Sequence, residues 1–170
     1  MNKDIKEILQ YLEPREDYIV WAGFAQFAHL GRKCSTDIDI FTDRLETKKR
    51  ISSDFQKKGW EKLSHDNTYP IWDKLEKNGT TFDIVYSQSA SKLLFSDIAK
   101  IEVYGHKIRF LSKEGLFITK LGQLTWENRT EEKRKRDLET IISLRKLIDM
   151  KKINELIKKL SDNFWKTGKI

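Results

Sequence analysis

Two aspartates separated by a single residue, Asp37 and Asp39, are the side chains of this sequence best placed to do chemistry. Polar and apolar residues alternate from 37 to 41, and this period of two predicts a β-strand with unlike faces. On such a strand the two carboxylates leave the same face, with Cα atoms roughly 6.5 to 7 Å apart, while Ile38 and Ile40 face the core. Carboxylates held so close repel one another, and a divalent cation relieves the repulsion. Mg²⁺ is the expected ion because it prefers hard oxygen ligands.

A third acid, Asp83, lies inside an otherwise apolar segment, 80–86, that also reads as a strand. An unpaired charge in such a strand is costly, so something must compensate it. If this strand lies beside 37–41, the three carboxylates can hold one or two metal ions, which would neutralise a triphosphate and lower the pKa of an attacking hydroxyl. Asp83 is then also placed to act as a general base.

A turn of small residues, Ala22-Gly23, follows a predicted strand at 18–22 and precedes a predicted helix at 24–30. Small residues at a strand-to-helix turn let backbone N–H groups and the helix N-terminus approach a phosphate. Phosphoryl transfer depends mainly on positioning and charge stabilisation. A small-residue turn, a metal-binding acid cluster and a few cations are therefore sufficient to catalyse it on a nucleoside triphosphate. The chain has 26 acidic residues, so an acid-x-acid pair alone is expected several times by chance. The interpretation therefore depends on the combination.

The elements that must position these residues follow from periodicity and turn signals. Further helices are expected at 3–12, 46–58, 91–98, 113–124, 131–148 and 151–160, further strands at 60–64 and 70–77, and a further hairpin at 101–110. Asn78-Gly79 is a strong hairpin signal. We expect an α+β fold in which helices flank a mixed β-sheet, with a catalytic core at 1–111 and a helical region at 112–170 packed on it.

Composition narrows the class of protein. The single cysteine, Cys34, excludes an intramolecular disulfide and a cysteine-rich zinc site. Charged residues interrupt residues 1–20, no apolar run reaches spanning length, and we therefore expect a cytoplasmic protein without membrane contact. The net charge of +7 favours an anionic partner such as RNA, DNA or nucleotide phosphates. The excess comes largely from lysine-rich helical stretches, which are also typical of solvated helix faces.

The segment 18–41 resembles the signature of the DNA polymerase β-type nucleotidyltransferase superfamily. The matching residues are Ala22-Gly23-Phe24-Ala25, His29, Lys33, Ser35 and Asp37-Ile38-Asp39. More narrowly, the segment is similar to AbiEii-like toxins and related small nucleotidyltransferases. The resemblance implies a polymerase β-like fold, a nucleoside triphosphate such as ATP bound near Ala22, Gly23 and Ser35, and Mg²⁺ held by Asp37, Asp39 and Asp83. This sequence departs from the pattern at Ala22, Leu30, Lys33 and Ser35, where the family has glycine, glycine, arginine and threonine.

The resemblance continues downstream through residues 110–116, Lys120-Leu121 and Arg136-Asp137. It implies that Lys120 reaches the nucleotide phosphates or the acceptor, and that Asp137 supports Lys120 or orients the acceptor. The alternative for Lys120 is a side chain that extends from an apolar helix face to solvent. The basic run within 131–136 is equally an RNA phosphate contact or an exposed helix turn.

The leading hypothesis is transfer of a nucleoside monophosphate from a nucleoside triphosphate to a hydroxyl, with release of pyrophosphate. The toxin-like resemblance and the basic charge favour RNA as the acceptor, such as a tRNA end, and an antitoxin-like protein partner. One alternative is an aminoglycoside-type or lincosamide-type antibiotic nucleotidyltransferase. Another is a catalytically inactive binding module with a nucleotidyltransferase-like fold, because the Cβ of Ala22 would crowd a triphosphate or require a different turn.

Overall fold

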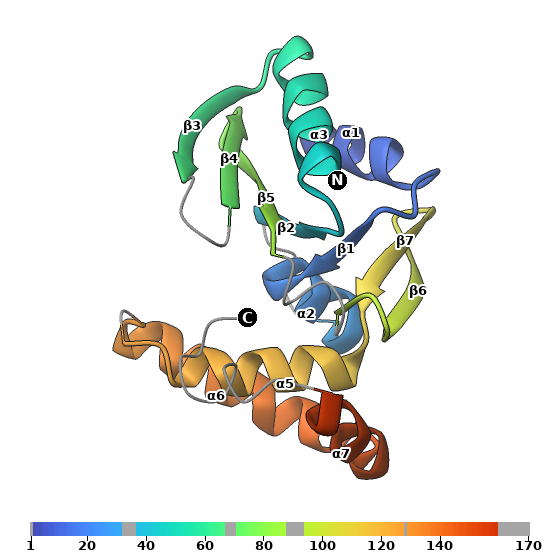
Figure 1. The fold of residues 1–170 in the computed structure, drawn as a ribbon, viewed down its shortest axis with the longest axis vertical. Helices are drawn as coiled ribbons and strands as arrows, with labels where there is room; N and C mark the ends of the chain where they lie inside the picture. The colour runs from blue at the N-terminus through green and yellow to red at the C-terminus, as the bar shows by residue number, and fades with distance from the viewer. Residues whose placement is uncertain (1, 32–36, 67–70, 88–93, 128, 160–170) are drawn as a thin grey trace. The chain divides into compact units, whose positions relative to one another are not determined.

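The computed structural model describes residues 2–31, 37–66, 71–87, 94–127 and 129–159. The chain divides into two compact units, Met1–Leu111 and Ser112–Ile170, and each is described by itself (Figure 1). The first unit is built on a β-sheet and the second is helical in the residues described. Among the helices of these residues, none has the length and apolar character that a membrane span requires.

A mixed sheet of seven strands forms the centre of the first unit. The strands are β1 (Tyr18–Trp21), β2 (Asp37–Thr42), β3 (Glu61–Asp66), β4 (Ile71–Lys77), β5 (Thr80–Tyr86), β6 (Ile98–Val103) and β7 (His106–Leu111). Their order across the sheet is β3-β4-β5-β2-β1-β7-β6. The pairs β2 with β5 and β1 with β7 are parallel, and the other neighbouring pairs are antiparallel. The central strands β5, β2 and β1 are the ones that carry the predicted site residues.

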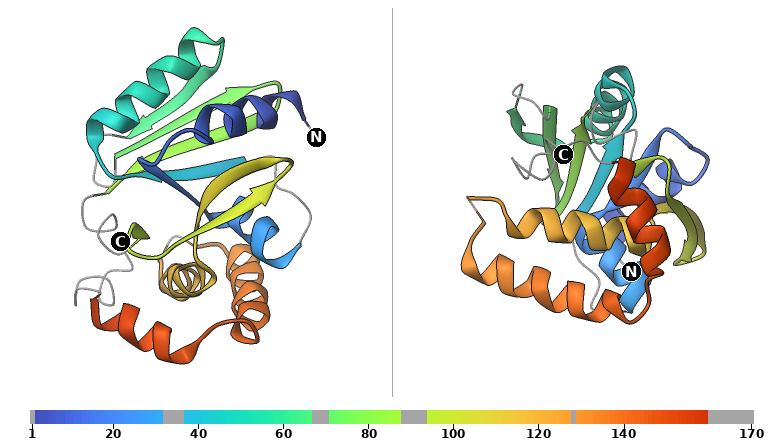
Figure 2. Two further views of the ribbon diagram at one scale, coloured as in Figure 1. Left: turned by 90° about the vertical axis from the view of Figure 1, so that its right-hand side faces the viewer. Right: turned by 60° about the horizontal axis from the view of Figure 1, so that its bottom comes forward.

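The described residues of the first unit form the helices α1 (Lys3–Leu12), α2 (Ala22–Leu30) and α3 (Leu45–Lys57). The ring of Phe55 in α3 packs on Phe82 in β5, with ring centroids 4.8 Å apart. The ring of Tyr11 in α1 meets the same Phe55 edge to face at 5.0 Å. Helices α1 and α3 therefore lie side by side over one face of the sheet (Figure 2).

Alternation along the central strands separates a buried face from a polar one. Ile38, Ile40 and Ile84 are fully buried on the face that α3 covers. Because neighbouring residues of a strand point to opposite faces, Asp39 and Asp83 project from the other face. The period of two in the sequence correctly predicted this division for 37–41.

The second unit contains α5 (Lys113–Leu124), α6 (Glu131–Arg145) and α7 (Met150–Lys159). Ser112 caps α5 by accepting a hydrogen bond from the N–H of Gly115, and Thr130 caps α6 by accepting one from Lys133. Such caps satisfy helix N–H groups that have no partner within the helix. Helices α5 and α6 lie side by side (Figure 1).

The α+β fold with a mixed sheet and flanking helices is confirmed, and most predicted elements match within two or three residues. The helix expected at 91–98 is wrong at its end, because Ile98 begins β6 and pairs with Leu111 of β7. Residues 91–93 lie outside the described residues, as does Pro70 of the strand expected at 70–77. Cross-strand pairing with a distant segment outweighed the local helical pattern here.

Candidate active site

Two carboxylates and one ammonium group occupy a single row across three neighbouring strands. Parallel pairing of β2 with β5 places Asp39 opposite Asp83, and antiparallel pairing of β5 with β4 places Asp83 opposite Lys74. Residues at paired positions project from the same face of a sheet. Strand β5, which carries Asp83, thus lies beside strand β2, which carries Asp39. This adjacency is needed if their carboxylates are to share a metal ion.

Lys74 is a member of this row that sequence reasoning missed. The two-residue turn at Asn78-Gly79 joins β4 to β5 and pairs Lys77 with Thr80. Counting back along both strands from that turn pairs Lys74 with Asp83. The hairpin signal could therefore have identified Lys74 as the nearest cation in the row.

The third predicted carboxylate, Asp37, lies at the start of β2. It is exposed and pairs with Thr81 of β5. The hydroxyl Oγ1 of Thr81 donates to Asp37 Oδ1 at 2.7 Å. Asp37 thus shares the face of Asp39 and Asp83, but it lies two residues along β2, beside the row, and its carboxylate is held there by a threonine.

Asp83 is the most unusual acid of the row because it is buried and only partly satisfied. Its residue is 8% exposed, and its Oδ1 atom has no hydrogen-bond partner among the described residues. Burial raises the pKa of this carboxyl, and the negative charge of Asp37 adds to the rise. Lys74 and a hydrogen bond with Trp72 act in the opposite direction. The carboxylate form of Asp83 is therefore incompletely compensated by the protein itself.

The residues of this row fit a divalent cation. Among the described residues, no three His, Cys, Asp or Glu side chains are gathered into a group that could hold a metal ion. The buried, unpartnered Oδ1 of Asp83 nevertheless lies in register with Asp39. Hard oxygen ligands of this kind suit Mg²⁺, and a cation beside them would offset the cost of burying the charge.

The raised pKa of Asp83 predicts a specific dependence of stability on pH. A carboxyl whose pKa is higher in the folded state stabilises the fold most when it is protonated, below its unfolded pKa of about 4. That contribution is lost as the pH rises through the folded pKa. In the absence of metal, Asp83→Asn should therefore become more stable relative to wild type as the pH rises above about 4. Urea unfolding between pH 4 and 8 in EDTA measures the difference, and an opposite slope would contradict the burial argument.

Ala22 occupies the turn between β1 and α2 in a conformation that favours glycine. Its φ is +53°, in the left-handed region. An L-residue with a Cβ pays roughly 1 to 2 kcal/mol there. Trp21, the residue before it, is extended and supplies no side-chain cap to α2. The turn therefore has a backbone conformation that favours glycine, although the residue there is alanine.

Replacing this alanine by glycine should stabilise the protein slightly. Ala22→Gly removes the left-handed strain but adds about 0.4 to 1 kcal/mol of unfolded-chain entropy, so we expect a net gain of roughly 0.5 kcal/mol. Ala22→Val should destabilise, because a β-branched residue fits this region worse than alanine. Chemical denaturation of the three proteins tests the order. A loss of stability in Ala22→Gly would exclude a strained Ala22.

Two other residues of the resemblance have different outcomes. His29 Nε2 lies 2.7 Å from the carbonyl oxygen of Leu111, so its N–H donates to the backbone of β7. This contact ties the end of α2 to the sheet. It favours a structural role for His29 over a role as a ligand or base. Ser35, predicted to contact the nucleotide, lies outside the described residues.

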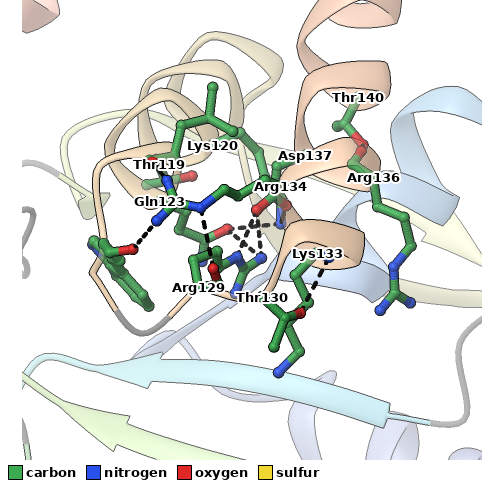
Figure 3. A network of polar contacts seen from close by, with 12 residues as sticks. Thr119, Lys120, Gln123, Arg129, Thr130, Lys133, Arg134, Arg136, Asp137 and Thr140 are labelled. Carbon is green, nitrogen blue, oxygen red and sulfur yellow. Dashed lines mark hydrogen bonds and ion pairs between the residues drawn. The ribbon is translucent and has the colours of Figure 1, made fainter.

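The second unit holds a buried ionic network around Asp137 (Figure 3). Lys120 Nζ donates to Asp137 Oδ1 at 2.8 Å and to Gln123 Oε1 at 2.8 Å. Arg129 Nε donates to the other carboxylate oxygen, Asp137 Oδ2, at 2.7 Å. The residues Lys120 and Asp137 are 4% and 2% exposed. The interpretation of Lys120 as a side chain that extends to solvent is therefore wrong, and the contact with Asp137 implied by the resemblance is present.

The basic run at the start of α6 divides into structural and exposed cations. Arg134 donates to the backbone carbonyl oxygens of Leu124 and Trp126. Arg136 lies 3.6 Å from Glu132 and is exposed, as is Lys133. Part of this run therefore fixes the connection between α5 and α6, and the remainder faces solvent.

No family model matches the sequence, and a search of curated proteins also finds no match. Solved structures do share its fold. The crystal structure of ANT(2'')-Ia in complex with adenylyl-2''-tobramycin has a TM-score of 0.60 at 14% identity, with 91% of this chain and 95% of that chain covered. A lincosamide antibiotic adenylyltransferase, LnuA, bound to lincomycin, has a TM-score of 0.57 at 17% identity, with 87% and 98% covered. An antigenic nucleotidyltransferase-like protein from Paracoccidioides brasiliensis has a TM-score of 0.57 at 17% identity, with 96% and 86% covered.

At these identities the likeness establishes the fold alone. The chain has the fold of nucleotidyltransferases, as the resemblance implied. The narrower similarity to AbiEii-like toxins stays a prediction.

Proposed function

We propose that this protein transfers a nucleoside monophosphate from a nucleoside triphosphate to a hydroxyl acceptor and releases pyrophosphate. The observation that carries the proposal is the row of Asp39 and Asp83 on adjacent parallel strands, with one buried carboxylate oxygen that has no hydrogen-bond partner among the described residues. Proteins of the same fold include adenylyltransferases. Fold likeness alone does not define an activity, so the geometry of the row carries the argument.

The turn that we propose to bind phosphates, Ala22-Gly23, lies next to this row. Trp21, the last residue of β1, pairs with Asp39 of β2. Ala22 and Gly23 follow directly and begin α2, whose first N–H groups have no partner within the helix. A helix N-terminus attracts anions through these groups and through its dipole. The turn is therefore placed to bind phosphates of a nucleotide whose reacting phosphorus lies near Asp39.

The carboxylates are the residues that would hold Mg²⁺. Asp39 and Asp83 would be the principal ligands. Asp37, two residues before Asp39 on the same face of β2, would be a further ligand. When bound, Mg²⁺ would supply charge neutralisation for the triphosphate and a lower pKa for the attacking hydroxyl. Asp83 would additionally accept a proton from that hydroxyl. Its raised pKa belongs to the metal-free protein, because a bound cation lowers the pKa of its carboxylate ligands.

Lys120 and Asp137 act together in this proposal. Lys120 would bind the nucleotide phosphates or the acceptor, and Asp137 would position its ammonium group. Arg129 also contacts Asp137, so the carboxylate keeps one cationic partner if Lys120 turns to a phosphate. Ser35 would add a hydroxyl at the nucleotide.

RNA is the acceptor that we propose, such as the hydroxyl end of a tRNA. The net charge of +7 favours an anionic acceptor. The exposed cations Lys133 and Arg136 on α6 are available for phosphate contacts. Two of the structurally similar proteins have small molecules bound, adenylyl-2''-tobramycin and lincomycin. The competing acceptor is therefore a hydroxyl of a small molecule, and the experiment must compare it with RNA.

The decisive experiment is incorporation of label from each of the four α-³²P-labelled nucleoside triphosphates. The acceptors are an RNA pool that contains tRNA and a panel of aminoglycosides and lincosamides, each tested with Mg²⁺ and with EDTA. We expect Mg²⁺-dependent labelling of RNA. If a drug were labelled and RNA were not, the acceptor would be a small molecule rather than RNA, and the proposed transfer reaction would stand. RNA binding that weakens with salt, without turnover in any combination, would support the inactive binding module and contradict the enzyme.

A further inference from the structure

A polar pocket of about 360 Å³ lies between α3 and the β3–β4 hairpin. Its described lining includes Lys48, Lys49 and Ser52 of α3, Lys62 of β3 and Asp73 of β4. Ser52 lies four positions after Lys48 and three after Lys49, so it neighbours both of them on the surface of α3. The nucleotidyltransferase mechanism uses none of these residues.

The pocket opens on the face of the sheet opposite to the carboxylate row. Asp73 pairs with Ile84 of β5, whereas the next residue, Lys74, pairs with Asp83. Neighbouring strand residues point to opposite faces, so Asp73 points to α3 while Lys74 points to the row. A ligand in this pocket therefore has a site separate from the proposed reaction.

Two lysines share Asp73, whose carboxylate is the one in the described lining of the pocket. Lys48 Nζ lies 2.6 Å from Asp73 Oδ2, and Lys62 Nζ lies 2.9 Å from Asp73 Oδ1. The side chains of Lys48 and Asp73 are 1% and 2% exposed. With Lys49 included, the described lining carries three positive charges and one negative charge. The pocket therefore has an excess of positive charge beside a buried ammonium group.

Hydrogen-bond donors in the pocket exceed the acceptors that the described residues offer. Lys48 has three N–H groups, and Asp73 is the partner that the described residues supply to them. Ser52 Oγ is buried and has no hydrogen-bond partner among the described residues. Burial lowers the pKa of Lys48, and the charges of Lys62 and Lys49 lower it further, against the effect of Asp73. An anion with several oxygen atoms would satisfy these donors and offset the charge.

A purely structural role explains only part of this arrangement. The Lys48–Asp73–Lys62 bridge joins α3 to the hairpin, and a buried ion pair is stable only when its remaining donors are satisfied. That role leaves the buried hydroxyl of Ser52 without a hydrogen-bond partner among the described residues, and it makes no use of the exposed Lys49.

We propose that this pocket binds a phosphate group through Lys48, Lys49, Lys62 and Ser52. The group belongs either to a free phosphate or diphosphate or to the backbone of an RNA, since the recognising chemistry is shared. The proposal does not depend on the proposed transfer reaction.

Thermal unfolding of the full chain with inorganic phosphate, against chloride at equal ionic strength, tests the site. Saturating phosphate should raise the Tm of wild type by about 3 °C or more. Lys49→Gln and Ser52→Ala should each reduce that shift by at least half. Lys57→Gln is the matched control, because it removes the same charge from the same helix at a side chain that is 77% exposed and outside the described lining. Lys57→Gln should keep the full shift.

A second arm with a single-stranded oligoribonucleotide separates the two sources of the phosphate. If the group belongs to RNA, Lys49→Gln should weaken oligonucleotide binding and lower its salt slope by about one, while Lys57→Gln leaves both unchanged. If it belongs to a free ligand, phosphate and pyrophosphate raise the Tm and oligonucleotide binding does not respond to Lys49→Gln. Equal shifts in all variants would place the anion elsewhere and overturn the proposal. It would also be overturned if neither phosphate nor the oligonucleotide distinguished Lys49→Gln from Lys57→Gln.

Discussion

Asp39→Asn is expected to lower nucleotide transfer about 1,000-fold or more while leaving the fold intact. A metal-bound carboxylate at the reacting phosphate contributes several kcal/mol of transition-state stabilisation, and about 4 kcal/mol corresponds to this factor. Asparagine keeps the size of the side chain but loses its charge. Label incorporation at saturating Mg²⁺ and nucleoside triphosphate measures the loss, and circular dichroism with thermal unfolding checks the fold.

Asp43→Asn is the matched control because it removes the same charge just beyond the end of the same strand. Its activity should stay within a few-fold of wild type. Asp83→Asn should resemble Asp39→Asn, because the two carboxylates occupy paired positions. If Asp39→Asn retained full activity, the row would not be the reaction centre. If only one of the two aspartates mattered, a shared metal would be excluded.

The central sheet was largely predictable because its signals are local. The period of two from 37 to 41 identified β2 and its buried face, and the Asn78-Gly79 turn fixed the hairpin of β4 and β5. A one-residue slip in β2 would have exposed Ile38 and Ile40, so the hydrophobic pattern strongly specifies the register. Apolar runs with one polar face thus predict both the strand and the direction of its acids.

The surroundings of the acids were not predicted, because they depend on contacts between distant segments. Burial of Asp83 requires the order of strands in the sheet, whereas its pairing with Lys74 follows from the local hairpin of β4 and β5. The contact of Arg129 with Asp137 crosses the connection between two helices. The pairing of Lys48 with Asp73 joins a helix to a strand. Composition and spacing identify chemical groups, whereas their pKa values and partners follow from packing.

Ala22 shows both what the sequence predicts and what only the structure reveals. Its position between strand and helix was readable from the sequence, but its φ was not. A left-handed backbone at an alanine indicates that the turn is determined by its neighbours, β1 and α2, rather than by the residue itself. The methyl group of Ala22 therefore lies at the proposed phosphate site within a turn that suits glycine.

Asp137→Ala should destabilise the second unit by about 3 to 5 kcal/mol, because it leaves the buried ammonium group of Lys120 without a carboxylate partner. Lys120→Met should cost less, since Asp137 keeps Arg129 and methionine fills a similar volume. Glu139→Ala, an exposed acid on the same helix, is the matched control and should change stability by less than about 0.5 kcal/mol. Urea unfolding followed by circular dichroism gives all three values. Equal losses of stability for Asp137→Ala and Lys120→Met would mean that Arg129 does not stabilise Asp137 once Lys120 is removed. Asp137 would then depend on Lys120 as its only effective cationic partner.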